Sequence, residues 1–413
     1  MVRSHAQSRA GDCRAPSQIC GAAWSDRTLT RLRMAVFRRL PSYILVIRRR
    51  PAVAGLISHL GSPLISRSFL FYLSGPPTIF LLPVASNEIM EEEIEVDSSS
   101  DRDSGFEDRI SNYTASITAS VLAYPVENGR RYHAFRSGLY YLPNDELEQE
   151  RLDLAHLLMT KGISDKLFLA PIQTDHMHRV LDIGTGTGLW SMSMGDEYPH
   201  AEIIGNDLSA IQPPWVPPNV RFMLDDVESE WVYNRPFDFI FCRYMATCIS
   251  DWPRLVRQAH ENLEPGGWAE FQDYDFNFYS RDGSLKQDSN FLKWTHALLD
   301  GFRSLPIGKE PCPGPKLHGW LVDAGFENIT TRKFSFPLGV WAKDKRLKEL
   351  GMINLLQFMN GLEAFSLRLL VDHMRMDRDD YNDLLEKVRV DLSNKKIHAQ
   401  MDFYVTYGQK RRD

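Results

Sequence analysis

The segment RVLDIGTGTG joins a carboxylate to three closely spaced glycines. Arg179–Ile183 is a short apolar run with β-branched members, which predicts a buried strand. Gly184, Gly186 and Gly188 allow the backbone to turn sharply and to approach a ligand with no Cβ in the way. A helix that begins at Leu189 would direct its first N–H groups at the same ligand. Strand, glycine turn and helix predict the adenosine-binding corner of a doubly wound α/β sheet.

The glycine spacing distinguishes between two adenosine ligands. A dinucleotide fingerprint requires G-x-G-x-x-G, whereas this loop reads G-x-G-x-G and has Leu189 where the third glycine would stand. Asp182 lies two residues before the first glycine, and a carboxylate there suits a cationic amino-acid group better than a pyrophosphate. S-adenosylmethionine (SAM) carries both an ammonium and a sulfonium. The loop therefore favours SAM, and a nicotinamide-dependent reductase is the disfavoured alternative.

Two later apolar runs each end in carboxylates. Ala201–Asn206 predicts a second strand, and the following Asp207 could accept both ribose hydroxyls, unless it only ends the strand in a turn. Asn219–Leu224 predicts a third strand, after which a carboxylate could accept from the adenine amine, unless this is a solvated acidic loop. The predicted cofactor contacts are Asp182, Gly184, Thr185, Gly186, Gly188, Asp207, Leu208, Asp225, Asp226 and Val227.

The rest of the chain continues the alternation of strands and helices. Further strands are expected at Phe237–Cys242, Trp268–Gln272 (after a Pro265-Gly266-Gly267 turn), Asn328–Phe334 and Ile397–Tyr407, the last antiparallel to the one before it. Helices are expected at Trp252–Leu263, Asn290–Arg303, Lys316–Ala324, Asp344–Met376 and Tyr381–Leu392. The sequence thus predicts an α/β, Rossmann-like, seven-stranded sheet, with a helical insert before the last strand that could cover a substrate.

These residues carry a family resemblance. The series RVLDIGTGTG, NDLS, DDVES, FDFIFCRYMATCISDW and LEPGGWAEFQDYD resembles the class I SAM-dependent methyltransferases. With the flanking segments ENGRRYHAFRSGLYYLPNDELEQERLDL and PLGVWAKDKRLKELGMINLLQ, it is similar to fungal methyltransferases related to the loss-of-aflatoxin-expression regulator of secondary metabolism. The resemblance begins near Ser111 and implies SAM as cofactor. For the regulator type it also implies a nuclear location and a velvet-type partner protein. Cys242 departs from the family pattern and could reshape the substrate side.

Residues 121–175 are expected to form an N-terminal helical cap on the methyltransferase domain, which spans residues 176–413. Two helices are expected between Val121 and Ile172, one of them at Leu147–Lys161, where apolar residues recur at helical spacing. Segments before the glycine loop often fold over the cofactor as a lid. Tyr132 and Arg136 could therefore face the pocket, or they could be a core aromatic and a solvated arginine.

The first 120 residues differ in composition from the rest. Residues 1–90 hold 12 Arg, no Lys and three acids, a balance of +9, whereas the remainder has a balance of −15. Residues 1–89 lack sustained periodicity and are interpreted as a poorly ordered or non-native extension, with a mitochondrial transit peptide or a membrane anchor as alternatives. Residues 90–120 read as an acidic disordered leader. The acidic body argues against nucleic-acid binding, and we expect no membrane partner. The expected location is cytoplasm or nucleus.

Candidate nucleophiles and bases give no catalytic assignment. The five cysteines (Cys13, Cys20, Cys242, Cys248 and Cys312) show neither C-x-x-C spacing nor a neighbouring His in ligand register, so we expect neither disulfides nor a metal site. A base is needed only if the methyl acceptor is protonated, and the candidates are His133, Tyr244, His260, His296 and His318. The leading hypothesis is a SAM-dependent methyltransferase acting on a small molecule or a protein. The alternative is a SAM-binding regulatory protein in which transfer is vestigial.

Overall fold

The computed structural model describes residues 123–412. The extension predicted for residues 1–89 and the acidic leader predicted for residues 90–120 lie outside the described part of the chain, as do residues 121, 122 and 413. Within residues 123–412, no helix is both long enough and apolar enough to cross a membrane.

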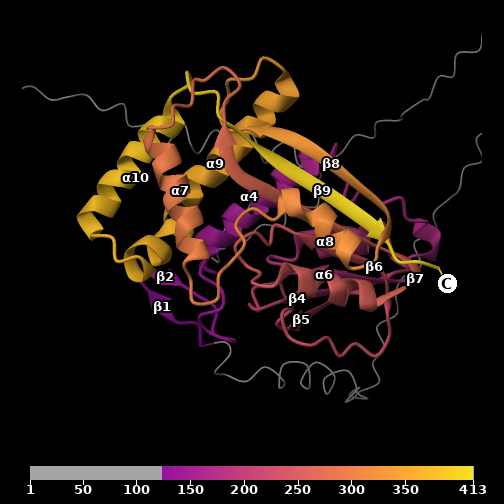
Figure 1. Ribbon diagram of the computed structural model, residues 1–413. Helices are drawn as coiled ribbons and strands as arrows, with labels where there is room; N and C mark the ends of the chain where they lie inside the picture. The colour runs from indigo at the N-terminus through magenta and orange to yellow at the C-terminus, as the bar shows by residue number, and fades with distance from the viewer. Residues whose placement is uncertain (1–122, 413) are drawn as a thin grey trace, which may run out of the picture. The chain divides into compact units, whose positions relative to one another are not determined.

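A seven-stranded sheet forms the centre of the molecule (Figure 1). Its strands lie in the order β5-β4-β3-β6-β7-β9-β8. The five strands β3 to β7 are parallel, and β9 is inserted antiparallel between β7 and β8. This order confirms the predicted Rossmann-like sheet and the antiparallel last strand. The bounds are β3 Arg179–Ile183, β4 Glu202–Asp207, β5 Val220–Leu224, β6 Phe237–Arg243, β7 Leu263–Tyr279, β8 Glu327–Pro337 and β9 Gln400–Gln409.

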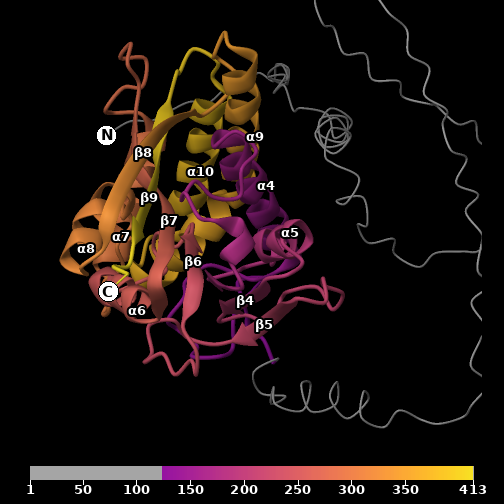
Figure 2. The same cartoon turned by 90° about the vertical axis from the view of Figure 1, so that its right-hand side faces the viewer.

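Side chains alternate across the sheet because successive residues of a strand point to opposite faces. In β6, Phe239 and Phe241 join one apolar cluster while Ile240 and Cys242 join the other. The helices α6 (Trp252–Glu261) and α8 (Leu317–Asp323) cover the second face, and α5 (Leu189–Glu197) packs on the first (Figure 2). Both faces are therefore buried, as in other parallel sheets.

Four longer helices gather on the α5 side of the sheet, at the carboxyl ends of its strands (Figures 1 and 2). They are α4 (Glu146–Gly162), α7 (Asn290–Arg303), α9 (Lys345–Ser366) and α10 (Arg378–Ser393), with a π-helical turn at Leu367–His373 after α9. The predicted insert between the last two strands is confirmed as α9, the π turn and α10. Helix α4 packs along α9, so the segment before the sheet and the insert near its end form one cap.

The expectation of two helices between Val121 and Ile172 is wrong. Before α4 the described residues form a short hairpin of β1 (Val126–Glu127) and β2 (Arg130–Arg131). Asn128 and Gly129 connect them with φ of 52° and 77°. An Asn-Gly pair with both residues at positive φ is a preferred two-residue hairpin turn, and this signal overrides the weak helical pattern.

The Pro265-Gly266-Gly267 turn also differs from the prediction. The structure includes these residues in the irregular start of β7, with Gly266 at φ +84°. A register shift in the pairing of β6 with β7, between Phe237 and Phe239, accommodates them. The fifth strand is therefore much longer than Trp268–Gln272, and its far end reaches the helical cap.

Candidate cofactor site

The three glycines of the loop have different physical roles. All have positive φ, +65° at Gly184, +58° at Gly186 and +80° at Gly188. A Cβ on Gly184 would overlap the Met245 side chain, and one on Gly188 would lie 2.5 Å from the Phe222 ring. A Cβ on Gly186 would meet only Leu152 Cδ1 at 3.8 Å. Gly184 and Gly188 are thus required by packing, whereas Gly186 leaves space open on its ligand side.

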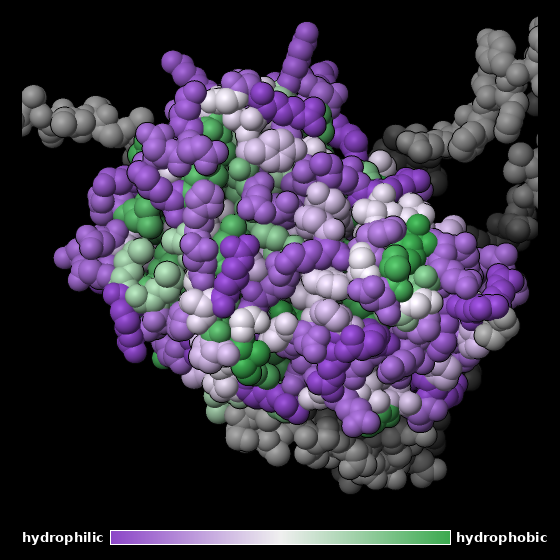
Figure 3. Space-filling model, in the orientation of Figure 1, coloured by the Kyte–Doolittle hydropathy of each residue, from purple (hydrophilic) through white to green (hydrophobic). Residues whose placement is uncertain are grey.

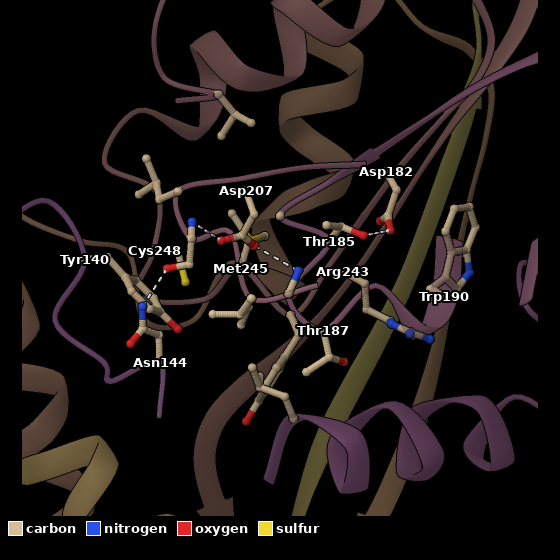
Figure 4. A pocket seen from close by; sticks show the side chains of 18 of the residues that line it. Tyr140, Asn144, Asp182, Thr185, Thr187, Trp190, Asp207, Arg243, Met245 and Cys248 are labelled. Atoms are coloured by element: carbon tan, nitrogen blue, oxygen red, sulfur yellow. Dashed lines mark hydrogen bonds between the residues drawn. The ribbon is translucent and has the colours of Figure 1, made fainter. Parts of the chain in front are cut away.

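A cavity of about 140 Å³ opens beside this loop (Figure 4). It lies where the carboxyl ends of β3, β4, β5 and β6 meet, the usual ligand position in a doubly wound sheet. Nine of the ten predicted contacts line it: Asp182, Gly184, Thr185, Gly186, Asp207, Leu208, Asp225, Asp226 and Val227. Gly188 does not, because it caps α5 and packs on Phe222.

Asp207 at the end of β4 holds the glycine loop in place. Its carboxylate accepts a hydrogen bond from the Gly186 N–H at 2.8 Å and another from the Ser209 N–H at 2.9 Å. Burial raises the pKa of this carboxyl to about 6. Carboxylate oxygens have further lone pairs, so Asp207 can still accept from hydroxyl groups in the cavity.

Asp182 lies at the opposite end of the cavity floor, in β3. It is 3% exposed, and its Oδ2 accepts hydrogen bonds from Thr185 Oγ1 at 2.6 Å and Ser191 Oγ at 2.7 Å. Burial raises the pKa of Asp182 to about 6, and the charge of Arg243 partly opposes that rise. A buried carboxylate with these properties favours a cationic ligand group at this end.

Of the two aspartates directly after β5, Asp226 is the more strongly engaged. Asp226 is buried, accepts from Ser229 Oγ at 3.1 Å, and pairs with Arg136 Nη1 at 3.2 Å. Asp225 is half-buried, and burial raises its pKa. Both line the cavity, so which of them meets the adenine stays a prediction. Arg136 reaches the site only through Asp226.

Tyr132 does not face the cavity. Its side chain is 1% exposed, and its ring packs under the guanidinium of Arg368, with 4.6 Å between the guanidinium carbon and the ring centroid. The sequence left open whether Tyr132 faces the pocket or lies in the core, and the structure shows that it is a core aromatic. From the same segment, Tyr140 and Asn144 line the cavity instead.

The sequence did not indicate several residues that line the cavity. They come from the cap, from the end of β6 and from the loop that follows it: Tyr140, Asn144, His156, Arg243, Met245 and Cys248. Figure 4 labels all of them except His156. The available signal was the position of Arg243 at the carboxyl end of the fourth strand, next to the glycine-loop strand in the sheet. The cap residues had no such signal because their approach depends on tertiary packing.

Arg243 is the partly buried cation of the site. Its Nη2 lies 2.7 Å from His156 Nδ1, while its Nη1 is buried with no hydrogen-bond partner among the described residues. Burial lowers the pKa of Arg243 to about 10, so it stays charged at neutral pH. Burial and the Arg243 charge hold the pKa of His156 well below its usual value. A neutral His156 therefore accepts from Arg243.

The chemistry of these groups fits SAM. Asp182 and Arg243 provide an anion and a cation at the same end of the cavity, beside Trp190 (Figure 4), and this pair complements an ammonium and a carboxylate. The orphaned Arg243 Nη1 needs an acceptor such as a carboxylate oxygen. At the loop, Gly186 leaves the room that a bound nucleoside requires, and Asp207 supplies the acceptor for hydroxyl groups.

A second cavity, of about 50 Å³, lies under the helical cap. It shares Tyr140, Leu152, Tyr244 and Cys248 with the first cavity, so these four side chains form a common wall. Most of its other lining residues are aromatic or aliphatic, and they come from α7, α9 and the far end of β7. The sequence predicted the covering insert but not this chamber.

Of the candidate bases, Tyr244 alone lines a cavity. It has an unusual backbone φ of +62°, and its hydroxyl accepts from Arg151 Nη1 at 2.8 Å. Burial raises the pKa of Tyr244, although Arg151 opposes the rise, so the phenol stays protonated at neutral pH. His133 is buried away from both cavities. No catalytic residue is assigned.

The described cysteines are buried or partly buried thiols. Cys242 is 1% exposed in the sheet core and lines neither cavity, so it does not reshape the substrate side. Burial raises the pKa of Cys248 and that of Cys312, the latter to about 12. Among residues 123–412 no three His, Cys, Asp or Glu side chains form a potential metal site.

Comparisons with known proteins agree with this geometry. Residues 145–331 match the model of a methyltransferase domain. Over 296 residues the chain is 45% identical to methyltransferase pytC of Aspergillus terreus. This match covers 71% of this chain and 90% of that protein. The chain belongs to this family of fungal methyltransferases. It is also 35% identical over 288 residues to the secondary metabolism regulator LAE1 of Cochliobolus heterostrophus, and 33% identical over 300 residues to the probable methyltransferase tdiE of Emericella nidulans. These matches cover 68% and 71% of this chain and 92% and 91% of the relatives.

The family assignment confirms the resemblance seen in the sequence. The chain is a SAM-dependent methyltransferase, and SAM is its cofactor. The reductase alternative is thereby excluded. The relatives include both methyltransferases and regulators of secondary metabolism.

Proposed function

We propose that this methyltransferase acts on a small-molecule acceptor of fungal secondary metabolism, bound in the second cavity beside SAM. The observation that carries the proposal is the common wall of Tyr140, Leu152, Tyr244 and Cys248 between the two cavities. The two cavities adjoin at these residues, so an acceptor that extends from the second cavity past them would meet the cofactor directly. The helical cap covers that chamber, which suits a small molecule better than a folded protein.

We further propose that Asp182 and Arg243 hold the amino-acid end of SAM, and that Asp207 accepts from its ribose hydroxyls. When bound, SAM supplies an activated methyl group that passes to a nucleophilic atom of the acceptor and leaves S-adenosylhomocysteine. The chain's own residues position the reactants and exclude water. Tyr244, which stays protonated, can donate a hydrogen bond to the acceptor but is poorly suited to remove a proton from it.

A protein acceptor, or a regulatory role with a velvet-type partner, is the second candidate, and the regulators among the relatives favour it. One of these relatives is named as a protein-methionine methyltransferase, laeA of Emericella nidulans, 33% identical over 290 residues. The face of the molecule in Figure 3 is mainly hydrophilic, with small and separate apolar patches. On that face there is no broad apolar surface for docking a partner. We propose the cytoplasm or nucleus as the location.

The test is to supply the purified full chain with methyl-labelled SAM and extracts of fungal cells that lack the gene. The metabolite fraction and the protein fraction are supplied separately, and a Gly186→Val variant is the control. Label in a small molecule, absent with the variant, is the expected result. Label in protein alone would contradict the proposal and favour a protein acceptor. No label in either fraction, with SAM binding intact, would favour the regulatory role.

A further inference from the structure

We infer that the second cavity accepts one flat, uncharged, largely apolar ring of the acceptor and binds an oxygen of that ring through the indole N–H of Trp294. This inference rests on the proposed function and names the chemical class of the acceptor. Its basis is the composition of the chamber walls, their charge balance and one buried donor that has no partner.

Aromatic side chains dominate the chamber. Phe276 and Phe278 from β7 meet Phe358 and Phe365 from α9, and Trp294 from α7 closes another side. Ring centroids are 5.3 Å apart for Phe278 and Phe358, and 6.5 Å apart for Trp294 and Phe365. Such walls favour a planar ring, because aromatic pairs are stabilised beyond what their buried area alone contributes. At about 50 Å³ the chamber is much smaller than the roughly 150 Å³ cavity that binds benzene, so a single ring is the most it can take, and that ring must extend past the common wall toward the first cavity.

The chamber has no free charge to offer a ligand. Among the described residues that line it, Arg151 alone carries a full charge. Arg151 is 1% exposed, and both of its hydrogen bonds to the equally buried Glu148 are short, at 2.6 and 2.9 Å. Although burial alone would lower the pKa of Arg151, the Glu148 carboxylate raises it. The charges of Arg151 and Glu148 neutralise each other. A charged group on the methyl acceptor would therefore lose its water here without gaining an opposite charge.

One donor in the lining lacks a partner. Trp294 is 1% exposed, and its Nε1–H is buried without a hydrogen-bond acceptor among the described residues. A buried donor without a partner is destabilising, and an oxygen on the bound ring would supply the missing acceptor. Tyr244 provides a second, weakly used donor on the common wall, because its hydroxyl lies 3.5 Å from Gln357 Oε1, at the outer limit of a hydrogen bond.

Three probes of similar shape separate these claims: anisole, with an ether oxygen; toluene, with none; and benzoate, with a negative charge. Binding of each is measured by calorimetric or NMR titration of the full chain saturated with S-adenosylhomocysteine. We expect anisole and toluene to bind and benzoate to bind at least tenfold more weakly. Trp294→Phe keeps a ring but removes the donor. This variant should bind anisole about fivefold more weakly than the wild type, the effect of one net hydrogen bond, and should bind toluene with unchanged affinity.

Leu298→Trp fills the chamber from α7, since Leu298 lines it and is 8% exposed. This variant should bind neither anisole nor toluene, while its affinity for S-adenosylhomocysteine stays at the wild-type value. Should the larger side chain prevent folding, Trp294→Phe still tests the donor.

Each contrary result has a definite meaning. Equal anisole affinity in wild type and Trp294→Phe would overturn the role of the indole donor. If benzoate binds as tightly as anisole, the claim that the ring of the acceptor is uncharged fails. If neither anisole nor toluene binds the wild type while S-adenosylhomocysteine does, the chamber is a packing void, the inference fails and the methyltransferase function stands. If S-adenosylhomocysteine itself does not bind, the proposed function fails with it.

Discussion

The carboxylate of Asp207 accepts the backbone N–H of Gly186 across 2.8 Å, which ties the end of β4 to the centre of the glycine loop. Gly186 is also the loop glycine whose missing Cβ leaves open space. One contact therefore links the residue that shapes the loop to the residue that leaves room for the cofactor. Substitutions on the two sides of this contact should have different effects.

Replacing Gly186 by Val should abolish SAM binding and leave the fold intact. The new Cβ would have no protein neighbour closer than 3.8 Å, and the branched side chain would extend into the cavity. The positive φ of this position should cost at least about 1–2 kcal/mol of folding free energy, because Val is β-branched. Calorimetric titration measures the affinity, and a thermal melt measures the stability.

Gly188→Val is the matched control for that variant. Its Cβ would overlap the Phe222 ring, so this variant should lose more stability than Gly186→Val does. A folded Gly186→Val protein with wild-type affinity for SAM would refute the placement of the site.

Replacing Asp207 by Ala should weaken SAM binding by about 1–3 kcal/mol, the range for losing a charged hydrogen-bond acceptor. Part of this loss would come from the loop, because the Gly186 and Ser209 N–H groups lose their acceptor. Asp207→Asn should be milder, since its amide oxygen still accepts one bond. If Asp207→Ala binds normally and Asp226→Ala does not, the ribose and adenine roles of these carboxylates are exchanged.

Replacing Arg243 by Met should weaken the binding of S-adenosylhomocysteine. It should not weaken the binding of 5′-methylthioadenosine, because this ligand lacks the amino-acid end. The expected loss for the first ligand is about 1.5–3 kcal/mol, the value of a hydrogen bond to a charged group. Paired titrations of the two ligands against wild type and variant measure it. Equal losses for both ligands would show that Arg243 acts on the fold of the site rather than on the carboxylate.

Four carboxyls, three of them buried and Asp207 partly buried, predict how the free energy of unfolding depends on pH. Burial raises the pKa of Asp182 and Asp207 to about 6, and that of Glu270 and Asp273 to about 7. The folded values exceed the ordinary ones of 3.8 and 4.5. The unfolded chain therefore binds fewer protons between about pH 4 and 7, and the stability that these groups contribute at low pH is lost as the pH rises through 6 to 7.

Thermal melts of the ligand-free protein from pH 5.5 to 8 test this dependence. The melting temperature should fall up to about pH 7, where these carboxyls are ionised in the folded protein as well, and should level off above it. A melting temperature that rises steadily would contradict it. The affinity for SAM should show the opposite trend and decline below about pH 6, because a cationic group prefers the ionised Asp182.

Strands β3, β4 and β5 were predictable from the sequence because they are short, largely apolar, and either followed by a glycine turn or bounded by a carboxylate. Arg179–Ile183 and Asn290–Arg303 have the predicted bounds. The hairpin at Asn128 and Gly129 was missed, although its Asn-Gly pair is a known turn signal. Local chemistry of this kind can be read from the chain before any tertiary contact is known.

The site was only partly predictable, for a physical reason. The loop residues and Asp207 follow directly from strand ends, which the sheet must bring together. Tyr140 and Trp294 reach the cavities only through the packing of the cap, between elements far apart in the chain. The sequence carries no periodic signal for such contacts, so the chamber under the cap emerged from the structure alone.

Native mass spectrometry after incubation with SAM tests the central claim most directly, with the wild type and Gly186→Val measured side by side. The account predicts a cofactor adduct on the wild type, one per chain, and none on the folded variant. Absence of an adduct on the wild type, or an equal adduct on both proteins, would contradict the assignment of the glycine-loop cavity as the SAM site.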